Sequence, residues 1–91
     1  MKLLRSASFV RSSRRLIKKN PSAAAALRAT LELLGEDPFH PRLRTHKLRG
    51  NLAGSWAASV SYELRIVFEL VQYEEGQAIL LESVGTHDEV Y

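Results

Sequence analysis

Apolar residues in the first twenty positions recur at helical spacing. Over residues 8–20, Phe9, Leu16 and Ile17 form a stripe near the 3.6-residue period, and basic residues occupy most of the remaining positions. Ser8 suits the N-cap of such a helix because its hydroxyl can accept a backbone N–H. We therefore predict a first helix that begins at Ser8 and ends before an Asn-Pro pair.

A second helix is predicted directly after Pro21, whose fixed φ suits a first helical turn. Residues 22–34 are dense in strong helix formers. Gly35 is a suitable C-terminal cap. The predicted buried side of this helix carries Leu27, Leu31 and Leu34. One proline between the two helices favours an antiparallel hairpin.

The periodicity changes after the proline-containing loop 36–42. Four segments read as strands, with turn residues between them: 43–50, 55–62, 64–71 and 78–85. In the third segment, apolar residues alternate with Arg65, Val67, Glu69 and Val71, which is typical of a sheet covered on one face. A short edge strand over 2–6 is also compatible with the pattern.

The connections between these strands are too short for crossover helices, so the sheet should be mainly antiparallel. The pattern therefore predicts an α+β fold, with an N-terminal helical hairpin packed on a sheet of four to five strands. A chain of 91 residues with 45% hydrophobic positions suffices for one domain, residues 1–91.

The composition excludes several classes of site. The chain has no cysteine, which excludes disulfides, thiolate zinc sites and a cysteine nucleophile. The spacing of His40, His46 and His87 matches no metal motif, and the glycines form no phosphate-binding loop. We expect no metal and no cofactor. No apolar run approaches the roughly 20 residues that span a bilayer, and the N-terminus does not resemble a signal peptide, so a cytoplasmic location is expected.

Charge is strongly polarised along the chain. The first 31 residues hold eight of the 13 Lys and Arg residues and none of the 10 acidic ones. Such a distribution favours a negatively charged partner, either nucleic-acid phosphate or an acidic protein segment. A basic helix face that is simply solvated is the alternative.

Arg65 and His87 are the strongest candidates for chemistry. Arg65 stands in the middle of a predicted strand, opposite the apolar face, where a guanidinium could hold a phosphate bidentately. An ion pair with Glu69 or Glu82 is the structural alternative. His87 follows the last predicted strand, where an imidazole could transfer protons near neutral pH, or could equally be an exposed residue of the tail.

Three segments, in this order and at this spacing, resemble the RelE/ParE superfamily of toxin–antitoxin toxins: HKLRGNLAGSW (46–56), YELRIVFEL (62–70) and VGTHDEVY (84–91). The resemblance covers nearly the whole chain and is greatest to the YafQ-like ribosome-dependent mRNA interferases. It implies the same fold as the periodicity does. It also implies a toxin that inhibits translation as a metal-free endoribonuclease, in which an mRNA 2′-OH attacks the adjacent phosphate and expels the 5′-oxygen.

The resemblance also implies a role for five residues. His87 matches a tail histidine used as an acid or base, and Arg65 matches a strand arginine that stabilises phosphate. His46 matches a histidine before a turn, Glu63 stands where the family carries Asp, and Tyr91 matches a terminal aromatic that orients substrate. A regular strand would place His46 on the face of Leu48 and away from Lys47. The YafQ-like pattern has a further histidine where this chain has Ser59.

The same resemblance implies an mRNA and ribosome partner and an antitoxin with an acidic segment. The residues proposed to contact RNA phosphates are basic: Arg11, Arg14, Arg15, Lys18, Lys19, Arg42, Arg44, Lys47 and Arg49. An antitoxin would use the same surface. No membrane partner is expected.

Two alternatives to the endoribonuclease remain open. ParE-like toxins share the fold but inhibit DNA gyrase, and a plasmid stabilisation role fits either mechanism. The loss of a histidine at Ser59 is also compatible with a domain that binds an antitoxin without catalytic activity.

Overall fold

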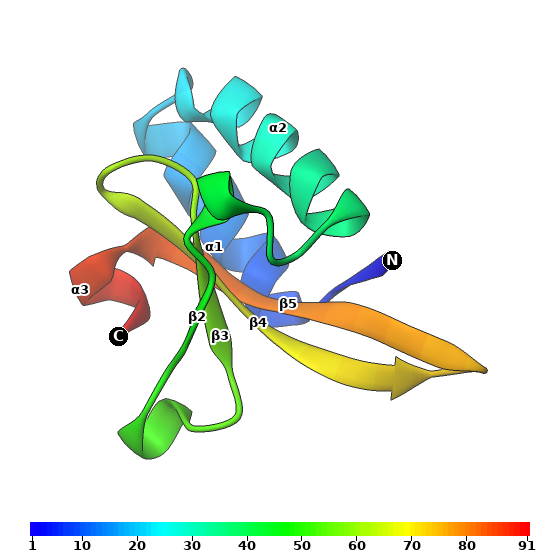
Figure 1. Ribbon diagram of the computed structural model, residues 1–91. Helices are drawn as coiled ribbons and strands as arrows, with labels where there is room; N and C mark the ends of the chain where they lie inside the picture. The colour runs from blue at the N-terminus through cyan, green and yellow to red at the C-terminus, as the bar shows by residue number, and fades with distance from the viewer.

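The computed structural model describes residues 1–91 and is an α+β fold of two N-terminal helices on a five-stranded sheet (Figure 1). The elements, in chain order, are β1 (Lys2–Arg5), α1 (Ala7–Lys19), α2 (Ala23–Glu36), β2 (His46–Lys47), β3 (Trp56–Ser59), β4 (Leu64–Tyr73), β5 (Gly76–Thr86) and α3 (His87–Val90). Two short 3₁₀ helices, η1 (Pro41–Leu43) and η2 (Gly50–Leu52), flank β2. No helix is long and apolar enough to cross a membrane.

The sheet is mixed but mainly antiparallel, as predicted. Its strand order is β1-β5-β4-β3-β2, and only the β1–β5 pair is parallel. The predicted N-terminal edge strand is confirmed as β1. Figure 1 shows the long β4–β5 hairpin extending away from α3, so α3 lies at the opposite end of this hairpin from its turn.

Both helix caps differ from the prediction. Ser6, not Ser8, caps α1, because its hydroxyl accepts from the Phe9 N–H at 3.0 Å immediately after β1 ends. Gly35 does not end α2, which continues to Glu36. The terminal ammonium of Met1 donates to the Gly35 carbonyl at 2.7 Å and supplies this helical carbonyl with a partner.

The strand lengths also differ from the prediction. β2 spans two residues, because the 3₁₀ helices η1 and η2 interrupt the chain on both sides of it. β3 spans four residues, because the chain turns after Ser59, where the Val60 N–H donates to the Leu64 carbonyl. β4 and β5 are instead longer than predicted, with 10 and 11 residues, and pair along nearly their whole length. The sheet therefore depends mainly on this one hairpin.

The core lies between the sheet and the two long helices. Ile66 and Phe68 from β4, Ile79 and Leu81 from β5, and Phe9 from α1 are all buried in one cluster. These β4 residues belong to the alternating set predicted to face the core. The prediction that the other face is open fails at Val67, which is only 2% exposed.

A side-chain hydrogen bond spans the central strand close to Val67. Ser55, just before β3, donates through its hydroxyl to Glu82 Oε1 at 2.6 Å. Since β3 and β5 lie on either side of β4, this bond passes across the central strand. Glu82 is the extra residue of a bulge between the Val67–Ser83 and Phe68–Leu81 pairs.

Two serines of the N-terminal segment complete the hydrogen bonding of β5 beyond the end of β1. β1 pairs with β5 only as far as the Arg5–Leu81 pair. Past this point, the Ser6 hydroxyl donates to the Glu82 carbonyl at 3.2 Å, and the Val84 N–H donates to the Ser12 hydroxyl at 3.1 Å. Helix α1 thus takes the place of a strand beside the last part of β5.

Truncating the buried end of α1 should destabilise the fold far more than truncating its exposed end. Phe9 is 2% exposed and Ile17 is 37% exposed on the same helix. We expect Phe9→Ala to reduce the free energy of unfolding by about 3–5 kcal/mol, and Ile17→Ala by less than about 1 kcal/mol. Chemical denaturation measures both, and equal losses would contradict this assignment of the core.

Candidate functional site

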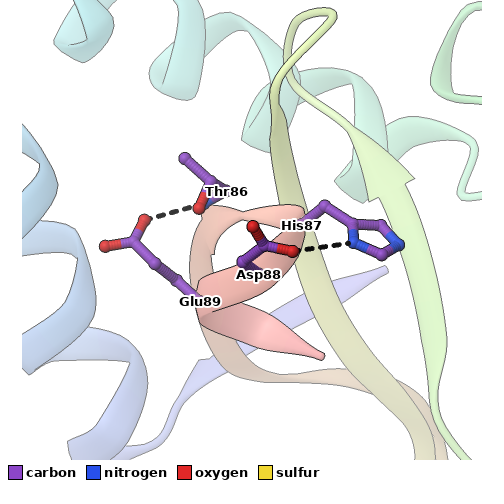
Figure 2. A network of polar contacts seen from close by, with 4 residues as sticks. All are labelled: Thr86, His87, Asp88 and Glu89. Atoms are coloured by element: carbon purple, nitrogen blue, oxygen red, sulfur yellow. Dashed lines mark hydrogen bonds and ion pairs between the residues drawn. The ribbon is translucent and has the colours of Figure 1, made fainter.

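The candidate site is centred on α3, the single helical turn that follows β5. Thr86 and Glu89 form a capping box, in which the Thr86 N–H donates to Glu89 Oε1 at 2.9 Å. His87 is the first residue of this turn and its side chain is 73% exposed. Figure 2 shows His87 and Glu89 projecting to opposite sides of α3, so the helix is capped on one side and presents an imidazole on the other.

The His87 imidazole lies close to two neighbouring side chains, those of Asp88 and Tyr91. Its Nδ1 lies 3.6 Å from Asp88 Oδ1. The Tyr91 ring meets it edge-on, with ring centroids 4.4 Å apart. The Tyr91 N–H donates to the His87 carbonyl at 3.0 Å, so the helical turn itself holds the two rings together.

Gly85 is the residue that allows α3 to fold back against the sheet. A Cβ at this position would lie 3.1 Å from Glu89 Cβ and 3.1 Å from Glu89 Oε1. These distances are shorter than ordinary van der Waals contact. A side chain here would therefore push α3 away from the end of β5.

Arg65 projects from β4 on the face opposite the core, as predicted. In the sheet register it lies between Ser59 of β3 and Gly85 of β5. Its Nη1 donates to the Ser61 carbonyl at 2.7 Å and to the Leu64 carbonyl at 3.0 Å. The Nε and Nη2 groups have no protein partner, and no carboxylate forms a salt bridge with Arg65.

The ion pair that the sequence also allowed for Arg65 is therefore absent. Glu82 is instead the acceptor for Ser55. Glu69 forms no salt bridge. The fixed guanidinium retains donors that can bind an external anion.

Arg65 and His87 share one shallow depression of about 500 Å³ at the end of the β4–β5 hairpin. It is lined by Tyr62, Glu63, Arg65, Thr86, His87 and Asp88. Leu64 pairs with Thr86 in the register, so Glu63 and His87 immediately flank the last pair of the hairpin. The depression thus combines a cation, an imidazole and two carboxylates on an open surface.

Tyr91 is partly buried and lies near the charge of Arg65. Partial burial raises the pKa of the Tyr91 phenol above its usual value of 10.0, and the nearby Arg65 charge opposes part of this shift. The phenol is therefore protonated at neutral pH and can donate a hydrogen bond.

His46 lies on the same face as Arg65 but outside the depression. It pairs with Ala57, which in turn pairs with Val67, so two strand spacings, about 10 Å, separate its backbone from β4. Its Nδ1 is 3.0 Å from the Arg44 carbonyl. The structure brings Arg65, Glu63, His87 and Tyr91 together, and leaves His46 apart.

The basic residues expected to bind RNA form two separate groups. The first group is carried by α1, the helix that packs against β5 near one edge of the sheet. The second group comprises the basic residues of 42–49, around β2 at the other edge. All the candidates on both elements are exposed. Arg15 and Lys19 line a further depression with Glu89, and their charges contribute to lowering its pKa.

Sequence reasoning missed two features of this site. The Thr-x-x-Glu spacing of Thr86 and Glu89 is the signal of a capping box at a helix start, but the sequence analysis predicts no helix after residue 85. Tyr62, which lines the depression and is 93% exposed, had no sequence signal beyond its proximity to Glu63. No group of three or more potential metal-ligating side chains is present.

Comparison with known proteins defines the class of fold. The chain has the fold of the RelE/ParE toxins. YafQ from E. coli strain BL21(DE3) superposes with a TM-score of 0.80 over 99% of this chain and 97% of that one, at 18% identity. A YoeB/ParE toxin from Agrobacterium tumefaciens gives 0.77 over 96% and 99%, also at 18% identity.

A third solved structure, the toxin–antitoxin complex RelBE2 from Mycobacterium tuberculosis, gives a TM-score of 0.70 over 94% of this chain and 96% of that chain, at 20% identity. No protein-family model and no curated protein matches the sequence. The fold expected from the resemblance is therefore confirmed by structure rather than by sequence similarity.

Adding a methyl group at Gly85 should displace α3 without unfolding the sheet. We expect Gly85→Ala to shift α3, and with it the His87 ring, relative to Arg65 on β4, because the new Cβ would crowd Glu89. Gly76→Ala is the matched control, since nothing lies within 4 Å of a Cβ there. Ring-proton chemical shifts of His87 and Tyr91 report the change, and identical shifts in the two variants would contradict it.

The docking of α3 should weaken at acidic pH, because protonation of Glu89 weakens the capping box. The Thr86 N–H, followed by the Thr86 hydroxyl, lowers the pKa of Glu89 below its usual 4.5. The capping contribution is thus complete above about pH 4.5 and is lost as the pH falls through the lower pKa of the folded state.

Amide exchange at Tyr91 measures this loss of capping, and Glu89→Gln is the control. Glutamine keeps a side-chain oxygen for the Thr86 N–H but does not titrate. Relative to the intrinsic exchange rate at each pH, we expect the protection of the Tyr91 N–H to fall below pH 4.5 in the unmodified protein, with no such acid step in the variant. The same step in both proteins would show that Glu89 does not cause it.

Proposed function

We propose that this protein is the toxin of a toxin–antitoxin pair and acts as a ribosome-dependent endoribonuclease on mRNA. The observation that carries the proposal is the location of Arg65, Glu63, His87 and Tyr91 at one open end of the β4–β5 hairpin. The shared fold with YafQ and RelBE2 supports the toxin class. The site chemistry supports RNA cleavage within that class.

Arg65 is proposed to hold the scissile phosphate. Its Nη1 is fixed by two backbone carbonyls, so the guanidinium is already oriented before substrate binds. The remaining Nε and Nη2 donors can bind two oxygens of one phosphate. In the transition state these bonds would stabilise the extra negative charge of the phosphorane.

Glu63 and His87 are proposed to transfer the two protons that the reaction needs. Glu63 accepts the proton of the attacking 2′-OH, the 2′-oxygen bonds to phosphorus, and the bond from phosphorus to the 5′-oxygen breaks. Protonated His87 donates its proton to the departing 5′-oxygen. The products are a 2′,3′-cyclic phosphate and a 5′-hydroxyl, and no metal or cofactor takes part.

Tyr91 is proposed to position His87 and to donate its phenolic proton in a hydrogen bond to the bound nucleotide. Its edge-on contact limits the orientations of the imidazole. His46 is proposed to contribute RNA binding rather than proton transfer, since it lies outside the depression.

The two basic groups are proposed to bind phosphates of ribosomal RNA and mRNA. Their exposure allows salt-sensitive contacts that do not depend on base sequence. The same positive surface would accept an acidic antitoxin segment, and RelBE2, which has this fold, was solved as a toxin–antitoxin complex. A reaction on ribosomes places the protein in the cytoplasm.

Primer extension on a translated mRNA, with purified protein and ribosomes, tests the proposal. We expect cuts that require ribosomes and that fall by at least about 100-fold in both site variants. His87→Ala removes a general acid, and Arg65→Ala removes a group that stabilises transition-state charge. His40→Ala and Arg28→Ala are matched controls outside the depression and should cut at the original rate.

Cleavage that persists in both site variants would overturn the assignment of the site. An uncut message, together with arrested growth in cells, would overturn the nuclease proposal. A DNA gyrase supercoiling assay would then test the ParE-like alternative.

A further inference from the structure

Tyr62 is the most exposed large hydrophobic residue of the chain, and its ring forms no aromatic or cation–π pair within the protein. Its exposed fraction is 93%. The other exposed aromatic side chains each have a partner: Phe39 packs on Trp56, Tyr73 lies under Lys2, and Tyr91 packs on His87. Such an aromatic surface costs free energy in water, and an external ligand that covered it would recover that free energy.

The position of Tyr62 indicates which ligand covers it. It is the only hydrophobic residue among the six that line the depression of Arg65 and His87. It also lines an adjoining depression that reaches Lys19 and Asn20 at the end of α1. The ring therefore stands on the rim between a phosphate-binding arginine and a second basic region.

The turn that carries Tyr62 is held by hydrogen bonds on both sides of it. The Val60 N–H donates to the Leu64 carbonyl at 2.9 Å, and the Leu64 N–H donates to the Ser61 hydroxyl at 3.3 Å. Arg65 itself donates to the Ser61 carbonyl. The Arg65 guanidinium and the backbone that carries Tyr62 are thus held in the same short turn.

We propose that Tyr62 is a stacking platform for a nucleobase of the RNA strand whose phosphate is bound by Arg65. This inference rests on the proposed function and adds a binding residue to it. An exposed aromatic face beside a cation is the combination by which proteins bind single-stranded nucleic acid, because every base has a flat face and every nucleotide a phosphate. Stacking selects an unpaired strand but no particular base.

Binding of a short single-stranded RNA with 2′-O-methyl groups tests the proposal without requiring cleavage. These groups keep the bases and phosphates but remove the attacking hydroxyl. In fluorescence anisotropy, we expect Tyr62→Ala to raise the Kd by about 5- to 100-fold, the range reported for loss of one base–aromatic stack. Tyr62→Phe keeps the ring and should stay within about twofold of the unmodified protein.

Tyr73→Ala is the matched control. Tyr73 is also exposed, but lies near the turn of the β4–β5 hairpin, far from α3 (Figure 1). Its removal should leave the Kd unchanged. Thermal melting of the two Tyr62 variants should match that of the unmodified protein, since the Tyr62 side chain is almost fully exposed.

Abasic nucleotides identify the stacked base. At one position of the oligonucleotide, removal of the base should weaken binding to the unmodified protein and should not weaken binding to Tyr62→Ala any further. An unchanged Kd in Tyr62→Ala, equal effects of every abasic position in both proteins, or no RNA binding by the unmodified protein would each overturn the proposal.

The two proposals can fail separately. Coupling between Tyr62 and one base, with no cleavage on ribosomes, would retain the stacking platform and reject the nuclease. Ribosome-dependent cleavage that needs His87, with RNA binding insensitive to Tyr62, would retain the nuclease and reject the platform.

Discussion

The pairing of Arg65 with Gly85 across β4 and β5 is the constraint on which the candidate site depends. Gly85 has no side chain at the place where α3 folds back against the end of β5. That space is what α3 needs in order to fold back, as the 3.1 Å approach to Glu89 shows. The register of a single hairpin thus brings a strand arginine and a helix histidine together without any additional loop or domain.

Helix α1 secures the strand that leads to this site. β5 would have unpaired backbone groups after β1 ends at Arg5, and such groups are costly when buried. The hydroxyls of Ser6 and Ser12 supply the missing partners for Glu82 and Val84. The last residues before Gly85 are therefore fixed on both sides, by β4 and by α1, and the end of β5 is rigid where α3 begins.

The sequence predicted the elements whose periodicity is strong and missed those set by single contacts. The alternation in 64–71 placed Arg65 on the face away from the core correctly, because a strand of ten residues keeps its period. The burial of Val67 was not predictable from that period, which places this residue on the face opposite the core. The hydrogen bond that spans β4 was equally outside any local pattern, because Ser55 and Glu82 are 27 residues apart. The length of β2 was also missed, because 3₁₀ turns on both sides interrupt it.

The same distinction holds for the site. Arg65 and His87 were found from residue type and position, but their proximity depends on strand register, which no local pattern specifies. Tyr62 was overlooked because an exposed tyrosine is unremarkable in a sequence. It becomes significant only beside the guanidinium of Arg65, whose donors the structure leaves unpaired.

The register also bears on the absence of a histidine at Ser59. Ser59 lies beside Arg65 in the sheet, where an imidazole could have served as a proton acceptor. In this chain Leu64 and Thr86 form the last residue pair of the hairpin. Glu63 and His87 are therefore the next residues beyond the adjacent ends of β4 and β5. A carboxylate and an imidazole in the depression of Arg65 suffice, in the proposed reaction, for one proton to leave and one to arrive. The proton inventory of the proposed reaction therefore closes within the hairpin, without a third-strand histidine.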